Sequence, residues 1–384
     1  MKIAIDISQI VHPGTGVDTY TRNLVREVLR LNSAGKHEYI LFGTSLRRKH
    51  IFDFFSAQLR MEGLRFKSSF WLLPPTFTTQ LWNQIHHFKI ERLIGKIDLF
   101  HSSDWTQPPT GAKKVTTIHD LVVYKHPESS HPQIISVQKK KLDWSKKECD
   151  AIIVDSLATK KDCHKLLMIP NEKMHVIPLA AGNNVNEFAS KNDSEKEIEI
   201  HRVRDKYQLT KPYILAVGTR EPRKNLERLV EAVKKISGVD LVIVGKFGWG
   251  NSIRTKQLKI ENNSKILGFV SEQDVQPIYA GAIAYVHPSL YEGFGITIVE
   301  AMTLGVPVIT SNVSCLPEAG GDAALYINPH NVDDIRKKII EVIQLSPEKR
   351  KILIQKSLNQ AKKFSWEKTA RETLKVYEEV YGKK

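Results

Sequence analysis

The sequence predicts an α/β protein built from two doubly wound parallel-sheet domains in tandem. Short runs of β-branched residues alternate with longer helical patterns along the whole 384-residue chain. This alternation is typical of parallel sheets that are covered by helices on both faces. The length suits two domains at about 100–200 residues each. A polar and highly charged stretch without a strand pattern, residues 182–208, separates two groups of predicted strands.

Each half of the chain carries six predicted strands. They cover residues 2–7, 38–42, 97–101, 114–118, 151–154 and 175–178 in the first half, and residues 213–217, 240–244, 265–267, 284–287, 306–309 and 324–327 in the second. Helical patterns lie between them, among others over 18–31, 225–236 and 295–303.

The predicted domain boundaries follow from this pattern. We expect a Rossmann-like domain over 1–182, a linker region over 183–210 and a second Rossmann-like domain over 211–364. Residues 365–384 form a C-terminal helix whose first residues, Ser-Trp-Glu-Lys, are typical of a helix cap. This helix is a candidate to pack back on the first domain.

Composition excludes several classes of protein. An apolar share of 41% with 26% charged residues excludes a disordered or fibrous chain. No apolar run approaches the ~18–20 residues that span a bilayer, and Asp6 interrupts the apolar stretch at the N-terminus, which argues against a signal peptide. The cysteines, Cys149, Cys163 and Cys315, are odd in number and far apart. We therefore expect buried, inert thiols in a cytoplasmic protein.

The chain is basic, with a formal net charge of +15. Lysine and arginine cluster at 47–49, 139–141, 146–147 and 336–338. The sequence shows neither the interleaved aromatic residues of an RNA-binding sheet nor a helix-turn-helix or zinc pattern, so we predict no nucleic-acid partner. A positive surface also suits ligands that carry phosphate, or an anionic membrane. Charge alone does not decide between these ligands.

The most informative stretch runs from His287 to Met302, at a predicted strand-to-helix junction. Glu292 lies in the loop, and Glu300 follows eight residues later within the helix. Gly293 and Gly295 leave the backbone N–H groups at the helix start open to an anion. A carboxylate beside such a loop can accept hydrogen bonds from sugar or ribose hydroxyls.

This stretch resembles the E-x7-E motif of the family-4 retaining glycosyltransferases, which have the GT-B fold of two Rossmann-like domains that face each other across a cleft. Further segments resemble the family in the same order, and the resemblance covers nearly the whole chain. These segments are Gly14-Thr-Gly-Val-Asp, Thr117-Ile-His-Asp120, Gly218-Thr-Arg-Glu-Pro-Arg-Lys-Asn225, the helix and strand over 301–312, and residues 316–325.

The resemblance implies a role for each matching residue. Glu300 would hold the ribose of the nucleotide, and Glu292 would contact hydroxyls of the donor sugar. Arg223 and Lys224 would neutralise the diphosphate, and His119 would meet the donor sugar from the opposite wall. Thr219 stands where the family often has arginine, so Arg220 or Arg223 would substitute for it. The other expected donor-binding residues are Gly14, Gly16, Gly218, Phe294, Gly295, Ile296 and Thr297.

No metal and no cofactor are expected for the reaction. The chain contains no Asp-x-Asp pair, and cationic side chains could replace a divalent ion. Thr19 stands where a dinucleotide fingerprint beginning at Gly14 would need its third glycine, which argues against nicotinamide binding. The family implies retention at the anomeric carbon, and we favour front-face attack in which the departing phosphate accepts the acceptor's proton. Asp120 stays open as a covalent nucleophile.

Donor and acceptor are predicted only by class. The form of the segment from Gly218 to Asn225 favours GDP-mannose, with a UDP-sugar as the alternative. The acceptor would be a glycan or a lipid-linked glycan. The apolar, proline-interrupted segment 70–88 is either a core strand with its loop or an element for the acceptor or for the inner face of the cell membrane. Two other functions stay open, a nucleotide-sugar epimerase and a non-catalytic binder of nucleic acid or anionic surfaces.

Overall fold

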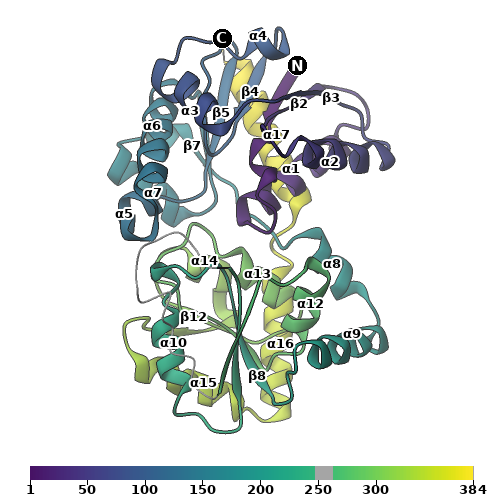
Figure 1. The fold of residues 1–384 in the computed structure, drawn as a ribbon, viewed down its shortest axis with the longest axis vertical. Coiled ribbons are helices and arrows are strands. Elements are labelled where there is room, and N and C mark those ends of the chain that lie inside the picture. Colours follow the sequence, from purple (N-terminus) through teal and green to yellow (C-terminus); the bar gives the residue numbers. More distant parts are fainter. Residues whose placement is uncertain (247–262, 384) are drawn as a thin grey trace. The chain divides into compact units, whose positions relative to one another are not determined.

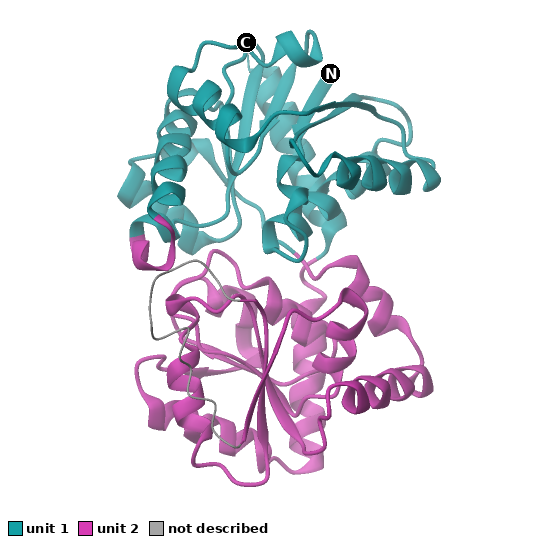
Figure 2. Cartoon of the chain, in the orientation of Figure 1, with its two compact units in different colours: residues 1–124, 132–179, 365–384 teal, residues 125–131, 180–364 magenta. Residues whose placement is uncertain are grey.

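A computed structural model describes residues 1–246 and 263–383 of the chain. It divides into two compact units, which Figure 2 shows in different colours. Unit 1 comprises residues 1–124, 132–179 and 365–384, and unit 2 comprises residues 125–131 and 180–364. The domain boundaries that we derived from the sequence stay a prediction. The segment expected as a linker contains two helices of unit 2, α8 (Asn183–Ser190) and α9 (Asp193–Lys206).

Unit 1 is built on a seven-stranded parallel sheet with the strand order β3-β2-β1-β4-β5-β6-β7. Helices cover both faces of the sheet (Figure 1). The strands are β1 (Lys2–Asp6), β2 (Glu38–Thr44), β3 (Lys67–Trp71), β4 (Leu99–Ser102), β5 (Lys113–Ile118), β6 (Ala151–Val154) and β7 (Met174–Val176). The longer helices are α1 (Gly16–Leu31), α2 (Lys49–Met61), α6 (Pro132–Glu148), α7 (Leu157–Leu167) and α17 (Trp366–Gly382). Shorter pieces are η1 (Ser8–Val11), α3 (Pro75–Thr79), the π-helix η2 (Gln80–Ile85), α4 (Glu91–Ile94), α5 (Val122–Lys125), which crosses into unit 2, and η4 (Asn171–Lys173).

Unit 2 repeats this plan with a six-stranded parallel sheet in the order β10-β9-β8-β11-β12-β13. The strands are β8 (Tyr213–Val217), β9 (Asp240–Val244), β10 (Ser264–Gly268), β11 (Ala284–His287), β12 (Val308–Ser311) and β13 (Ala324–Ile327). Besides α8 and α9, its helices are α10 (Leu226–Val233), α12 (Glu272–Ala280), α13 (Ile296–Thr303), α14 (Leu316–Gly320), α15 (Val332–Ile343) and α16 (Pro347–Ala361), with 3₁₀ turns η3 (Pro127–Ser129), η5 (Pro222–Lys224) and η6 (Gly321–Ala323).

The predicted fold class is confirmed, and all twelve predicted strands are present with small shifts at their ends. The sequence analysis missed β3. This strand, with the sequence Lys-Ser-Ser-Phe-Trp, lies at the edge of the unit 1 sheet, and none of its residues is buried. An edge strand that does not contribute to the core lacks the apolar run on which strand prediction depends.

The strand order reverses direction at one place in each sheet. In unit 1 the reversal lies between β1 and β4, and in unit 2 between β8 and β11. Loops at such a point leave the sheet in opposite directions and open a crevice at the carboxyl ends of the strands, where doubly wound folds bind their ligands. The glycine-containing loops singled out in the sequence analysis, after β1, β8 and β11, all lie at these two points.

The C-terminal helix α17 belongs to unit 1, although it follows unit 2 in the sequence (Figure 2). Its first turn is capped as expected, because the Ser365 hydroxyl accepts the Lys368 N–H. The helix packs against α1, and the Tyr377 hydroxyl lies 2.6 Å from Nδ1 of the buried His101. His101 Nε2 in turn lies 3.0 Å from the Thr117 hydroxyl. A buried series of hydrogen bonds therefore joins α17 to β4 and β5.

Other expectations concern membranes and cysteines. Among the described residues, no helix is both long and apolar enough to cross a bilayer. Cys149, Cys163 and Cys315 are buried and form no disulfide. Burial raises the pKa of all three thiols, which disfavours the reactive thiolate.

Candidate active site

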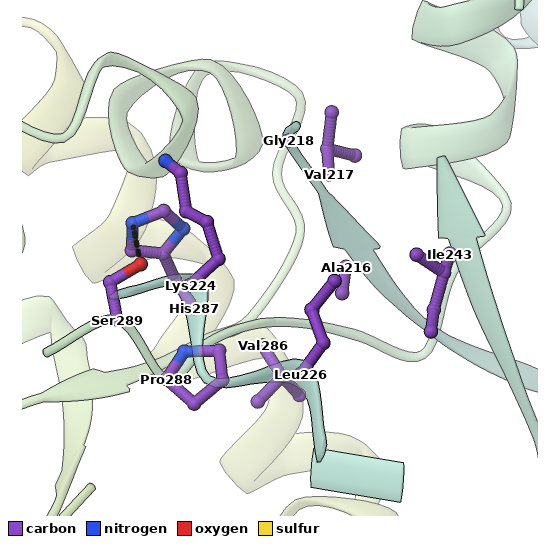
Figure 3. Close-up of a pocket in the computed structure, with 10 residues that line it drawn as sticks. All are labelled: Ala216, Val217, Gly218, Lys224, Leu226, Ile243, Val286, His287, Pro288 and Ser289. Carbon is purple, nitrogen blue, oxygen red and sulfur yellow. Dashed lines mark hydrogen bonds between the residues drawn. The ribbon is translucent and has the colours of Figure 1, made fainter. Parts of the chain in front are cut away.

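The loop after β8 packs closely against the backbone at the end of the neighbouring strand, β9. Gly218 has a φ of +146°, a conformation that glycine adopts most readily. At the end of β9, a Cβ on Gly245 would lie 1.9 Å from the Gly218 carbonyl oxygen, so a side chain there would displace the backbone. Gly218 also lies against the stem of Lys224 (Figure 3). The glycines thus let the loop fold tightly and place Lys224 at the strand end.

Asn225 fixes the far end of this loop. It adopts a left-handed conformation with a φ of +58° and directly precedes α10. Its side-chain amide donates to the carbonyl oxygens of Pro288, at 3.0 Å, and Pro329, at 2.7 Å. The Leu290 N–H donates to the Arg223 carbonyl at 2.8 Å. The loop after β8 and the loop after β11 are therefore held together by backbone and amide hydrogen bonds.

Glu292 is the centre of an ion cluster in unit 2. One carboxylate oxygen accepts from Lys224 Nζ at 2.6 Å, and the other accepts from Arg223 Nη1 at 2.7 Å. Nε2 of the buried His287 lies 3.3 Å from the first oxygen. Arg223 Nε also donates to Glu221 at 2.9 Å. The side chains of the two cations and of Glu292 are only 11–14% exposed, so water screens their attraction weakly.

The electrostatics of the cluster favour the ionised form of Glu292. Burial would raise the pKa of Glu292, but Arg223 and Lys224 outweigh burial and hold that pKa well below its usual range. Burial lowers the pKa of His287, which favours the neutral imidazole. Nδ1 of this imidazole lies 2.8 Å from the Tyr285 hydroxyl. Its Nε2 lies 3.1 Å from the Ser289 hydroxyl, a contact that Figure 3 shows.

Glu300 lies on α13 in a contrasting environment. None of the described residues forms an ion pair or a side-chain hydrogen bond with its carboxylate. Burial without a partner raises its pKa to about 7. Two carboxyl groups of one motif thus differ widely in acidity, which is common where a protein binds or transforms a substrate.

The start of α13 presents open backbone N–H groups. Gly295 precedes the helix with a φ of +94°, and none of the described side chains caps this end. The first N–H groups of a helix lack partners within the helix and attract anions. Phe294 is buried against Phe364, and Thr297 accepts a hydrogen bond from Tyr285 at 2.8 Å. Ile296 begins the helix.

The predicted residues of the first domain lie in unit 1. His119 directly follows β5, and its Nδ1 lies 2.7 Å from a carboxylate oxygen of Asp155, which directly follows β6. The Tyr20 ring packs edge-on against the imidazole, with ring centroids 4.6 Å apart. Gly14 has a φ of +78°, and a Cβ on either Gly14 or Gly16 would meet no atom within 4 Å. Both glycines are exposed, Gly14 in the loop before α1 and Gly16 at the first position of that helix.

The structure thus brings Arg223, Lys224 and Glu292 into direct contact. Arg220 is buried, and burial lowers its pKa. The roles assigned to these residues, and to His119 and Glu300, stay predictions. Sequence reasoning missed Glu221, His287, Tyr285, Tyr20 and Asp155. Asp155 and His287 did carry a signal, because each stands at the end of a predicted strand, where doubly wound folds gather their ligand-binding residues.

Within residues 1–246 and 263–383, no group of three or more histidine, cysteine or carboxylate side chains is placed to bind a metal ion. In the described site, Lys224 and Arg223 supply positive charge, and both form ion pairs with Glu292.

Comparison with known proteins defines the class of protein. The family description "Glycosyl transferases group 1" matches residues 197–360, and "Glycosyltransferase Family 4" matches residues 14–181. The chain is 32% identical over 288 residues to O-antigen chain mannosyltransferase B of Escherichia coli, covering 73% of this chain and 74% of that protein. It is 28% identical over 241 residues to O-antigen chain mannosyltransferase RfbU of Salmonella typhimurium, covering 62% of this chain and 63% of that protein.

The fold has a solved counterpart as well. The sucrose-phosphate synthase of Thermosynechococcus elongatus superposes with a TM-score of 0.73 at 18% identity, over 100% of both chains.

The chain is therefore a glycosyltransferase with the GT-B fold. It belongs to glycosyltransferase family 4, whose C-terminal part is the group 1 domain, and it transfers a hexose from a nucleotide sugar to a glycan acceptor.

Replacing Glu292 by glutamine should destabilise the protein at neutral pH. Removing the charge leaves Lys224 buried without a counter-ion, and breaking such a pair costs about 3 kcal/mol. Because the folded-state pKa of Glu292 is depressed, its stabilisation is fully present above the carboxyl's ordinary pKa and is lost as pH falls through the depressed value. The difference between E292Q and wild type in denaturant unfolding should therefore stay constant from pH 8 to 5 and shrink below that.

Glu341→Gln is the matched control, because Glu341 pairs with Lys338 on an exposed part of α15. It should change the unfolding free energy by less than about 1 kcal/mol. Equal effects of the two substitutions, or an E292Q deficit that grows as the pH falls, would show that the ion cluster does not contribute the stability assigned to it.

Proposed function

We propose that the chain is a retaining mannosyltransferase that moves mannose from GDP-mannose to a growing, lipid-linked polysaccharide such as an O antigen. The observation that carries this proposal is the Arg223–Lys224 pair at the reversal point of the unit 2 sheet, beside Glu292 and the open start of α13. Two relatives that are named as O-antigen chain mannosyltransferases support the choice of sugar and pathway.

The two cations suit a diphosphate leaving group. As the bond from the anomeric carbon to phosphate breaks, negative charge develops on the departing oxygen, and fixed cations that are shielded from water stabilise it most effectively. Lys224 and Arg223 already point at one carboxylate group, Glu292, so their orientation needs little change to meet an anion. The open N–H groups at Gly295, Ile296 and Thr297 add further donors.

The two glutamates suit the neutral parts of the donor. Glu300 has a carboxylate without a partner among the described residues, and it could accept hydrogen bonds from both ribose hydroxyls, which would favour its ionised form. Glu292 is ionised and could exchange a bond to one cation for a bond to a sugar hydroxyl. In this account the carboxylates bind and orient the donor and do not act as acid or base.

The reaction then needs little from the protein besides positioning. The bond between mannose C1 and the phosphate oxygen breaks, and a bond forms between C1 and the acceptor oxygen on the same face. The acceptor's proton passes to the departing phosphate oxygen, and GDP leaves. Asp120 stays an alternative, as a nucleophile that would form a covalent intermediate. No metal ion takes part in this scheme.

Lys224→Ala should lower kcat for mannosyl transfer from GDP-mannose by at least ~10²-fold, which is the usual loss when one donor to a developing anion is removed. The measurement is GDP release, together with transfer of labelled mannose to a lipid-linked acceptor. Lys235→Ala removes an exposed lysine near the end of α10 and should leave kcat unchanged.

Three results would contradict the proposed transfer of mannose from GDP-mannose. They are full turnover by K224A, transfer from UDP-sugars alone, and release of a new free sugar without any acceptor, which would indicate an epimerase. Inversion at C1 in the product would contradict the retaining stereochemistry.

The proposal also places the protein on the cytoplasmic face of the membrane, in contact with anionic lipid. The segment from β3 to η2 in unit 1 exposes large apolar side chains, namely Trp71, Leu72, Phe77 and Ile85. Cations flank the segment. Arg92 lies over the Phe88 ring, and Lys147 lies over the Trp144 ring, which donates its N–H to the Asn83 carbonyl in η2. Apolar groups beside cations favour a negatively charged bilayer surface.

The double substitution Leu72→Ser and Phe77→Ser should weaken cosedimentation with phosphatidylglycerol vesicles at least fivefold, because it removes exposed apolar area without touching the cations. Ile352→Ser removes an exposed apolar residue of α16 in unit 2 and should leave cosedimentation unchanged. Equal binding by all three proteins, or binding that is independent of lipid charge, would contradict membrane contact through this segment.

A further inference from the structure

The His119–Asp155 pair of unit 1 stands out among the buried charges of the protein. Strands β5 and β6 are neighbours in register, with Ile118 opposite Val154, so the residues that follow them lie side by side. Asp155 is 2% exposed, and one of its carboxylate oxygens meets His119 Nδ1 at 2.7 Å. The other oxygen, Oδ1, is buried without a hydrogen-bond partner among the described residues.

A purely structural role explains this carboxylate poorly. Burying a carboxylate is costly unless its oxygens are paired, and Asp155 leaves one oxygen unpaired. The side-chain hydrogen bond that the structure records for Asp155 is the bond to His119. By contrast, the buried Asp274 joins α12 to α9 through bonds to Arg202, Lys206 and Tyr207. The effect of Asp155 is therefore concentrated on the imidazole.

That effect is to fix the orientation of His119. Burial raises the pKa of Asp155, and the His119 imidazole opposes that rise by favouring the carboxylate. In its ionised form the carboxylate can only accept hydrogen bonds, which places the proton between the two groups on Nδ1. The Tyr20 ring packs edge-on against the imidazole and further restrains it. Tyr20 is itself held through its hydroxyl, which lies 2.7 Å from the Thr117 hydroxyl. Nε2 is the remaining nitrogen, and none of the described residues hydrogen-bonds to it.

The surrounding charges favour the imidazolium. Burial would lower the pKa of His119, but the carboxylates of Asp155, Asp104 and Asp120 outweigh it and raise that pKa. The other titratable groups around the ring are Tyr20 on α1, His101 on β4 and, beyond His101, Lys141 on α6. Burial lowers the pKa of His101 to about 3, so this neighbour is neutral at physiological pH. Protonation of His119 leaves an N–H on Nε2.

We propose that Asp155 is a positioning residue of the glycosyl-transfer reaction. By accepting Nδ1–H, it holds His119 in one orientation, with Nε2–H presented as a hydrogen-bond donor to an oxygen atom of the sugar substrate. This inference rests on the proposed function. It adds a residue that acts through His119, at a position that the resemblance to the family does not assign.

Asp155→Asn tests the proposal, because asparagine keeps the shape but removes the charge. In wild type, kcat/KM for the donor should fall as the pH rises through the pKa of His119. In D155N this fall should begin at a lower pH, and kcat at pH 7.5 should drop at least tenfold. The affinity for GDP alone should stay within twofold, because the nucleotide-binding residues lie in unit 2. A pH profile that is unchanged in D155N would overturn the proposal.

Nuclear magnetic resonance of ¹⁵N-histidine-labelled protein gives a readout that is independent of turnover. The His119 signals are assigned by their loss in H119Q. In wild type they should titrate at a higher pH than the imidazole of an unperturbed histidine. In D155N they should titrate at a lower pH than in wild type. A His119 that is neutral at pH 7 in wild type would sink the proposal, even if D155N does not fold.

Glu197→Gln is the matched control, since it breaks the exposed His201–Glu197 pair and should change neither kcat nor the His119 titration. The experiment also separates this inference from the proposed function. If wild type transfers no sugar, the proposed function fails and with it the catalytic role of Asp155, whereas the ¹⁵N titration still decides whether Asp155 holds the proton on His119.

Discussion

The ion cluster around Glu292 is the interaction on which the unit 2 site depends. A loop after β8 supplies Arg223 and Lys224, and a loop after β11 supplies Glu292. Both loops begin where the strand order of the sheet reverses, so without further contacts they would diverge. The shared carboxylate, together with the Asn225 amide bonds, holds them together. Two cations are thereby kept at the strand ends in fixed directions, which is the property that a site for a leaving diphosphate requires.

The two glutamates of the motif show how different surroundings give the same side chain different pKa values. Glu292 is paired with cations and stays ionised, whereas Glu300 is half-buried, has no partner among the described residues, and has a pKa of about 7 because burial disfavours its charged form. A carboxyl group that ionises only when its ligand binds can accept hydrogen bonds from hydroxyls, and the empty site does not carry the free-energy cost of a buried charge. In unit 1 another buried carboxylate, Asp155, is paired with a histidine. In each unit, the ends of parallel strands bring together residues that are distant in the sequence.

Much of this could be predicted from the sequence. The β-branched runs located every strand that contributes to a core, because a parallel strand that is buried on both faces leaves an apolar signature. The sequence analysis missed β3 because this strand is exposed at the edge of its sheet. The resemblance to the glycosyltransferase family also predicted Glu292, Glu300 and the two cations as donor-site residues. It could not predict that Glu292 binds both cations, nor that Asp155 meets His119 from 36 positions away, because such contacts depend on strand order and register. Burial, which sets the pKa of Glu300, is likewise a property of the packed structure.

The central claim is that Arg223 and Lys224 bind the diphosphate of the donor. Calorimetric titration with GDP and with guanosine tests it most directly, because the two ligands share the base and ribose and differ in the phosphates. Charge-assisted hydrogen bonds contribute about 1.5–3 kcal/mol each, so wild type should bind GDP at least ~10-fold more tightly than guanosine. The gap should largely close in the double variant Arg223→Ala and Lys224→Ala. Equal affinities in wild type, or a gap that survives the double substitution, would contradict the account.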